Sequence, residues 1–397
     1  MVDVYLEMLM NSVHSVQTQR QYARTFGLFL RFTGLKNGRE VISLDTKRLK
    51  ELVIEYVLHL KNTISPNSLP TYMYSVISFC EINDIELKWK KIKKFYPPKV
   101  KLSGDNAYST EDVRKMLATQ SKLVNRALIH FVASTACRAG AVLDETPNRP
   151  LCMGDLRDMP HGCQMVTIYT DSVQEYPAFL TPEASTALSD YHAERKANGE
   201  IFNQDTPVFL DRLGHPMNYD SVYSILSISA KNANVRGIMK NGRYPVQTCH
   251  GFRKRFNIIM KLDSNVADSV VEKAMGHKNG VKGRYFPITD ERLFEEFYNK
   301  GVPELTVDST ARDQIKIQQL EETNSQVNLE MIESLQEQIY ALTGQTNPKD
   351  FTTDFKNTLK TLESTKQIED IPLKEQMKLL SVKQKDLLLV QLVKQLS

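Results

Sequence analysis

Apolar residues recur at helical spacing in the first quarter of the chain. Residues three and four positions apart share one face of a helix, so each stripe of this kind predicts an amphipathic helix with a core-facing side. We interpret the aromatic residues among them as the core of a small helical bundle over residues 13–85. The stripes are Tyr22, Phe26 and Phe29; Leu49, Leu52, Tyr56 and Leu60; and Tyr72, Val76 and Phe79.

The pattern changes in the middle of the chain. Ser109-Thr110-Glu111-Asp112 has the composition of a helix start, with a capping residue and then acids in the first turn. Residues 108–300 combine such helices with one short β-stretch near residues 165–180. The chain is therefore predicted to be mainly α with a small β-sheet, in the α+β class.

The C-terminal part is predicted to be helical again. Residues 310–343 contain no proline or glycine, and they carry an approximate heptad that is broken at Asn324 and shifts phase near Ile332. This pattern favours a coiled coil, with a helix packed on its own body as the alternative. Residues 373–396 are another candidate for an amphipathic helix, and their density of apolar residues suggests a surface that binds a partner. The heptad residues are Ile317, Leu320, Val327, Met331, Leu335, Ile339 and Leu342.

A basic segment lies between the first bundle and the mixed region. Residues 88–101 contain seven lysines and no acidic residue, and Pro97-Pro98 favours extended chain there. Lysines add salt-sensitive affinity for a nucleic-acid backbone, so we interpret the segment as an interdomain linker on DNA; a solvated linker is the alternative. The DNA-contact candidates are Lys90, Lys91, Lys93, Lys94, Lys99 and Lys101.

Composition narrows the class of protein. A chain of 397 residues with 41% hydrophobic and 25% charged residues is typical of two or three globular domains. It has no run of 18 apolar residues, and the first seven residues lack a basic region, so we expect neither a membrane span nor a secretory signal. The five cysteines are scattered without a C-x-x-C pair, which argues against a zinc or disulfide framework and fits the cytoplasm.

The net charge of +4 is unevenly distributed. Residues 306–397 carry 11 basic and 14 acidic residues, whereas residues 1–305 carry 40 and 33. The positive part is thus the longer N-terminal part, as expected of a protein that binds a phosphate backbone.

Five residues in this positive part suggest a phosphodiester site. Arg138 and Arg253 can hold a phosphate with paired hydrogen bonds and remain charged. His250 and Arg253 are three residues apart and so share a helix face, and His277 follows a glycine at a predicted helix end. The histidines can move protons near neutrality, and Tyr285 can act as a nucleophile if cations and a base surround it.

Each of these features has a simpler interpretation when taken alone. The His250–Arg253 pair could be solvated, Tyr285 could be a half-buried aromatic residue, and Arg138 could pair with a carboxylate. Their joint occurrence in this order favours the phosphodiester site.

The order Arg, His-x-x-Arg, Gly-His and then Tyr eight residues later resembles that of the tyrosine recombinase (phage integrase) family, over roughly residues 15–300. The resemblance implies that Arg138 and Arg253 clamp the scissile phosphate, and that His250 and His277 bind it and help to move protons. It also implies that Tyr285 attacks to form a 3′-phosphotyrosyl link, without metal or cofactor. The partner would be double-stranded DNA, bound by a homotetramer on two duplexes.

The sequence departs from the family pattern at two places. The family carries an acidic residue three positions after the first arginine, where this chain has Ala141; Asp144 and Glu145 are candidate replacements. The family also uses a β-hairpin lysine as general acid, but residues 165–180 contain none. Lysines flank the motifs at positions 254, 278 and 282, and the general acid is not assigned.

The resemblance implies three domains. They are a helical core-binding domain with the basic linker (1–101), a catalytic domain (102–305) and a helical oligomerisation extension (306–397). The expected activity is site-specific recombination or integration of DNA in the cytoplasm, at the nucleoid if the host is a prokaryote. A catalytically impaired DNA-binding relative and strand cleavage like that of a type IB topoisomerase are the alternatives. The extension favours a mobile element or virus over a housekeeping resolvase.

Overall fold

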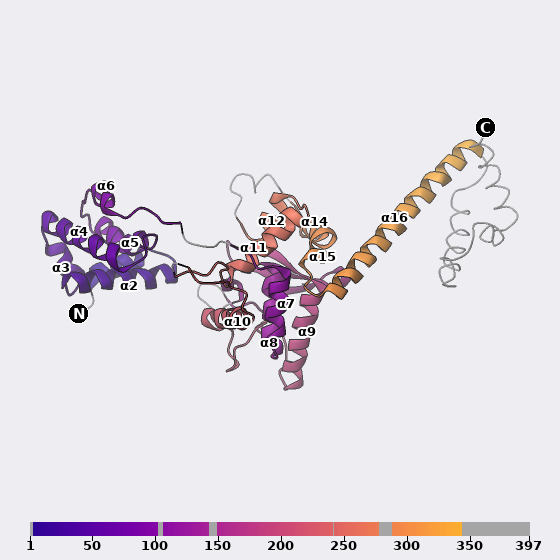
Figure 1. Cartoon of the computed structure of the whole chain (residues 1–397), viewed down its shortest axis with the longest axis horizontal. Helices are drawn as coiled ribbons and strands as arrows, with labels where there is room; N and C mark the ends of the chain where they lie inside the picture. Colours follow the sequence, from indigo (N-terminus) through magenta and orange to yellow (C-terminus); the bar gives the residue numbers. More distant parts are fainter. Residues whose placement is uncertain (1–2, 102–105, 143–148, 241, 278–287, 344–397) are drawn as a thin grey trace. The chain divides into compact units, whose positions relative to one another are not determined.

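The computed structural model describes residues 3–101, 106–142, 149–240, 242–277 and 288–343, with the backbone alone from residue 331 onward. The N-terminal part is a bundle of helices (Figure 1). They are α1 (Val4–Asn11), α2 (Val16–Thr33), α3 (Gly38–Ser43), α4 (Thr46–Thr63), α5 (Leu69–Ile82) and α6 (Trp89–Ile92), followed by the 3-10 turn η1 (Lys93–Phe95).

The core of this bundle is built from the aromatic residues of the predicted stripes. The rings of Phe26 on α2 and Phe79 on α5 stack with their centres 4.3 Å apart, and Phe29 meets Tyr56 on α4 edge to face at 5.3 Å. All four side chains are buried. Such pairs contribute about 0.5–1.5 kcal/mol each beyond the area that they bury. The helical prediction for this region is confirmed.

The basic segment is less extended than its prolines suggest. It begins with α6 and η1, and Ile92 is fully buried while Trp89 and Tyr96 pack on the bundle core. Three apolar residues thus attach the first half of the segment to the bundle, although the lysines around them are exposed. The extended chain starts at the prolines.

The middle of the chain mixes helices with a small sheet. The helices are α7 (Thr110–Ala118), α8 (Leu123–Thr135), α9 (Pro182–Ala197), α10 (Tyr219–Asn232), α11 (His250–Ile258), α12 (Asp268–Ala274), α14 (Asp290–Glu296) and α15 (Val302–Leu305). Shorter turns are η2 (Ala139–Val142), η3 (Met153–Asp155), η4 (Pro160–Gly162), η5 (Ile259–Asp263) and η6 (Phe297–Gly301). The strands are β1 (Leu156–Asp158), β2 (Gln164–Ile168) and β3 (Tyr176–Leu180).

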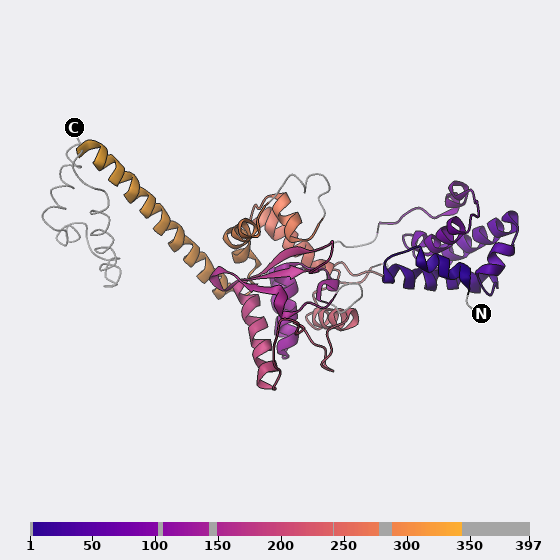
Figure 2. The same cartoon turned by 180° about the vertical axis from the view of Figure 1, so that it is seen from behind.

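The sheet is antiparallel in the order β1-β2-β3, and it separates two cores. Val166 pairs with Ala178, and both join the core of α7 to α10. Their neighbours Met165 and Phe179 point the other way and join the core of α12, α14 and α15. Figures 1 and 2 show these two helix groups on opposite sides of the strands. The α+β prediction is confirmed, and β2 and β3 occupy the predicted β-stretch.

The C-terminal end of the mixed region is held in place by buried charged groups. Arg255 Nη2 donates to the carbonyl oxygen of Leu305 at 2.9 Å and to Thr110 Oγ1 at 3.0 Å. The Glu183 carboxylate accepts from the backbone N–H groups of Val307 at 2.7 Å and Asp308 at 3.1 Å. These bonds satisfy polar groups that would be costly to bury alone.

The last described helix is α16 (Ser309–Thr343). Residues up to Ile315 belong to one compact unit of the chain, and the described residues from Lys316 onward belong to a second unit. Within the described ranges no helix is both long enough and apolar enough to span a membrane.

Candidate active site

Helix α11 presents the His-x-x-Arg motif. Between His250 and Arg253, a Cβ on Gly251 would lie 2.6 Å from Tyr108 Cε2 and 2.8 Å from Val246 Cγ1. Carbon atoms do not approach this closely, so glycine is required for the first turn of α11 to pack here. Arg253 is 6% exposed, whereas His250 lies at the surface.

Arg253 connects the three described segments of the predicted motif. Its Nη1 donates to the carbonyl oxygen of Ala136 at 2.5 Å, and its Nη2 donates to that of Met275 at 3.2 Å. The same Nη2 lies 2.8 Å from His277 Nε2. Ala136 ends α8 in a left-handed conformation (φ 50°), and Arg138 follows two residues later. The structure thus brings Arg253 and His277 into contact and places Arg138 on the segment that Arg253 holds.

The surroundings of His250 are strongly positive. Partial burial lowers the pKa of His250, and the charges of Arg253, Lys254, Arg138 and Arg243 lower it further. The imidazole therefore stays neutral to a lower pH than usual and is able to accept a proton. Arg243 was not predicted from the sequence. An anion at this position would be attracted by all four cations.

His277 is held by a carboxylate that the sequence analysis did not identify. Its Nδ1 lies 2.5 Å from Glu272 Oε2, and Lys261 Nζ lies 2.6 Å from Glu272 Oε1. Burial alone would raise the pKa of Glu272, but hydrogen bonds from Lys261 and His277 lower it below its ordinary value. The Arg253 guanidinium can only donate hydrogen bonds, so Nε2 of His277 must accept one. Nδ1 of His277 therefore carries the hydrogen atom and donates a hydrogen bond to the Glu272 carboxylate.

The turn that contains Gly276 and His277 packs against a tyrosine of β3. Gly276 has φ +65°, and a Cβ on it would lie 2.3 Å from Cε1 of Tyr176. The Tyr176 ring is buried and meets Tyr169 edge to face at 6.3 Å. Burial raises the pKa of its phenol, which keeps it protonated and uncharged. Tyr176 thus supports the turn that carries His277, a role that the sequence analysis missed.

Several predicted residues lie outside the described residues. They include the proposed nucleophile Tyr285 with Lys278 and Lys282, and also Asp144 and Glu145. The site is therefore described from Arg138, His250, Arg253 and His277.

Both departures from the family pattern have a described structural setting. Ala141 is buried in η2, where a methyl group packs in the core around α8. The loop between β2 and β3 has acids in place of a lysine, and the backbone N–H of Asp171 donates to Glu175 Oε2 at 2.8 Å. Lys254, next to Arg253 on α11, is half-buried.

The six lysines predicted to contact DNA are all exposed, at positions 90, 91, 93, 94, 99 and 101. In the part of the chain that the structure describes, no three His, Cys, Asp or Glu side chains converge as a metal site would require.

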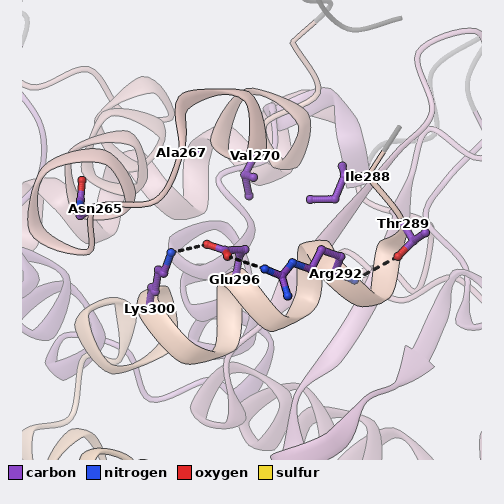
Figure 3. Close-up of a pocket in the computed structure, with 8 residues that line it drawn as sticks. All are labelled: Asn265, Ala267, Val270, Ile288, Thr289, Arg292, Glu296 and Lys300. Atoms are coloured by element: carbon purple, nitrogen blue, oxygen red, sulfur yellow. Dashed lines mark hydrogen bonds and ion pairs between the residues drawn. The ribbon is translucent and has the colours of Figure 1, made fainter. Parts of the chain in front are cut away.

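A pocket of about 790 Å³ lies between the start of α12 and the α14–η6 segment (Figure 3). Its two cations are paired with acids: Glu296 lies 2.6 Å from Lys300 Nζ and 3.7 Å from an Arg292 guanidinium nitrogen, and Arg292 also lies 2.9 Å from Glu295. The pocket contains none of the motif residues, and both of its cations are engaged in ion pairs. It is lined by Asn265, Ala267, Val270, Ile288, Thr289, Arg292, Glu296 and Lys300.

Comparison with protein-family models and with curated protein sequences finds no match to this chain. Solved structures do resemble it. The Tn1549 transposon integrase in complex with transposon right end DNA has a TM-score of 0.50 and 13% identity, over 74% of this chain and 98% of that one. A lambda integrase dimer bound to a COC′ core site has a TM-score of 0.48 and 14% identity, over 74% and 93%. XerH recombinase bound to palindromic difH substrate has a TM-score of 0.46 and 18% identity, over 71% and 79%.

The likeness to the Tn1549 integrase establishes the fold. The chain shares the fold of the Tn1549 integrase, which agrees with the mainly helical α+β class predicted from the sequence.

Proposed function

We propose that this chain is a tyrosine recombinase that breaks and rejoins DNA at specific sites. The observation that carries the proposal is the bonding of Arg253. This one guanidinium bonds the segment that precedes Arg138 and the turn that carries His277. Such an arrangement brings together residues that are distant in sequence, so that they can bind one phosphate group.

The proposed reaction is a transesterification at phosphorus. The Tyr285 oxygen gives up its proton and forms a bond to phosphorus while the bond to the 5′-oxygen breaks. The 5′-oxygen takes up a proton, so the products are a 3′-phosphotyrosine and a 5′-hydroxyl and the net proton transfer is from the phenol to the leaving oxygen. Arg138 and Arg253 stabilise the added charge on the non-bridging oxygens, and neutral His250 is placed to accept a proton. The reverse reaction with another 5′-hydroxyl rejoins the strands, so the bond energy is retained without ATP.

Duplex DNA is the proposed substrate, and the fold neighbour from Tn1549 was solved with transposon DNA. Exchange between two duplexes requires the cleavage of four strands. Because each chain contributes one nucleophile, we propose four protomers on two duplexes. The exposed lysines of residues 88–101 suit a sequence-independent backbone contact.

Helix α16 is proposed to hold protomers together as a coiled coil. Ile317, Leu320 and Val327 are 55%, 64% and 51% exposed. With Ile317 and Asn324 at a positions, Leu320 and Val327 fall at d positions. A single asparagine at an a position is a known device for fixing register and strand number, because it pairs with the same residue of its partner.

Replacing Ile317 and Leu320 together by aspartate should convert the DNA-free protein to monomers, since buried carboxylates at a and d positions oppose association. The measurement is mass by light scattering after size exclusion. The control replaces Gln318 and Gln319, which fall at the b and c positions away from the seam, by aspartate and should leave the mass unchanged. Equal masses for the two double variants would contradict a coiled coil.

Glu272→Gln should slow cleavage about 10- to 100-fold, because residues that orient a functional histidine typically have effects of this size. Glutamine keeps the shape but can donate to Nδ1, which would reverse the tautomer of His277. Single-turnover rates across pH should show a changed profile as well as a lower plateau. Glu295→Gln, at the exposed Arg292 pair, is the control. An unchanged rate and profile would show that Glu272 does not orient His277.

The function is tested by incubating two labelled duplexes of different length with the protein and EDTA. Products that join both labels would establish strand exchange. Cleavage or relaxation without joining would favour the topoisomerase-like alternative. Specific binding without cleavage would favour the impaired relative, for which the lysine-free β2–β3 loop is the physical reason.

A further inference from the structure

The segment between α10 and α11 contains a folded hairpin, described at residues 236–240 and 242–246, which we name the cationic hairpin. Lys240 and Arg243 exchange two backbone hydrogen bonds of 2.9 and 3.0 Å, and the Val246 N–H donates to the Arg236 carbonyl oxygen at 3.4 Å. Gly242 adopts φ +71°, as tight hairpin turns require. The chain therefore folds back on itself just before the His-x-x-Arg motif.

The base of the cationic hairpin is fixed to the body of the protein. The Arg236 guanidinium lies over the ring of Tyr244 at 3.9 Å and donates to Ser227 Oγ on α10 at 3.4 Å. The carbonyl oxygen of Pro245 accepts from the Asn106 N–H at 3.0 Å. A cation over an aromatic face is attracted to the ring, so this contact helps to hold the base in place.

The hairpin, whose base is fixed, exposes two large apolar side chains to solvent. Ile238 is 80% exposed and Met239 is 49% exposed, and they are adjacent in sequence. A single exposed apolar residue is ordinary, but an adjacent pair next to the turn of a braced hairpin suggests a surface kept for a partner. Lys240 follows the pair in sequence, and Arg243 lies opposite Lys240 in the hairpin. The partner must therefore bind cationic side chains as well as apolar ones.

The charge of the surrounding sequence identifies the chemistry of that partner. Residues 221–262 contain eight lysines and arginines and no aspartate or glutamate. The cationic hairpin lies within this stretch, and its last residue, Val246, packs against Gly251 of the His-x-x-Arg motif, where a Cβ would lie 2.8 Å from Val246 Cγ1. A polyanion that reaches the phosphate site would therefore meet the hairpin as well.

We propose that the cationic hairpin is a wedge that enters a DNA groove beside the scissile phosphate, with Ile238 and Met239 against the bases and Lys240 and Arg243 on flanking phosphates. This inference rests on the proposed function. Isoleucine and methionine are among the residues that wedge proteins insert between base steps, where they unstack the bases and bend the duplex. The site should consequently favour easily unstacked steps near the cleavage point.

The test uses a duplex selected from a random-sequence pool by the full-length protein, with 2-aminopurine placed at each position in turn. Wild-type protein should raise the fluorescence at one or two adjacent positions, since unstacking relieves quenching. The I238A/M239A double variant should lose this rise and bind about 10-fold more weakly, a loss of about 1.4 kcal/mol. Ile201→Ala is the matched control, because Ile201 is 90% exposed outside the hairpin.

The possible outcomes separate the wedge from the proposed function. Equal fluorescence with wild type and I238A/M239A would overturn the wedge, while cleavage by either protein would leave the recombinase proposal standing. A double variant that keeps the fluorescence but no longer joins two duplexes would assign the hairpin to contact with another protomer, which also overturns the wedge. Failure of the wild-type protein to select any duplex would overturn both proposals.

Discussion

Arg253→Lys should reduce single-turnover strand cleavage by about 10²–10³-fold, the usual loss when a group that stabilises transition-state charge is removed. Lysine keeps the charge but replaces a planar fork with a single ammonium group. It cannot bond Ala136, Met275 and His277 at the distances that the guanidinium spans. The rate would be measured on a nicked duplex with saturating protein, so that weaker binding does not limit it.

The control for this variant is Arg292→Lys, in an exposed position whose cation pairs with Glu295. Circular dichroism and thermal unfolding of both variants would show whether the chain still folds. A folded Arg253→Lys protein that cleaves as fast as Arg292→Lys would contradict the central role of Arg253.

Gly276→Ala should destabilise the protein by about 2–5 kcal/mol. About 1–2 kcal/mol comes from the left-handed backbone and about 1–3 kcal/mol from overpacking. The added carbon would lie 2.3 Å from the Tyr176 ring, so the turn or the strand must move. His277 would move with the turn, and cleavage should fall together with stability. Urea unfolding monitored by circular dichroism gives the free energy of unfolding.

Gly199→Ala separates the two causes of this loss. Gly199 also has a positive φ, +92°, but a Cβ there would meet nothing within 4 Å. Its cost should be that of the backbone alone. In a Tyr176→Ala background the cost of Gly276→Ala should approach the same value, because the collision is removed. Equal costs for the two glycines in the wild-type background would contradict the role of Tyr176.

The helices could be predicted because each leaves a local signal, whereas the roles of the four described motif residues stay predictions. Phe26 and Phe29 are spaced for one helix face, and the contact of Arg253 with His277 follows from the family order of the motif. Tyr176 could not be predicted, because its contact with Gly276 joins positions 100 residues apart and no periodicity marks it.

Other missed residues left weaker signals. Glu272 lies five residues before His277, so an acid near the Gly-His turn was visible but had no stated role. Arg243 lies in the acid-free stretch 221–262, which a count of charges along the chain would have found. The short helix α6 could not be predicted from periodicity, because it has four residues and buries Ile92 among exposed lysines.

The central claim is tested most directly by trapping the covalent intermediate. Nicked duplexes from the flanks of the protein's own gene would be incubated with wild type, Tyr285→Phe and Tyr298→Phe in EDTA, and run on denaturing gels. Tyr298 is 4% exposed and its ring stacks on His161 at 4.0 Å, so it serves as the buried tyrosine control. We predict a protein–DNA band with wild type and Tyr298→Phe that is absent with Tyr285→Phe. Specific binding without a band from any of the three proteins would contradict the recombinase assignment.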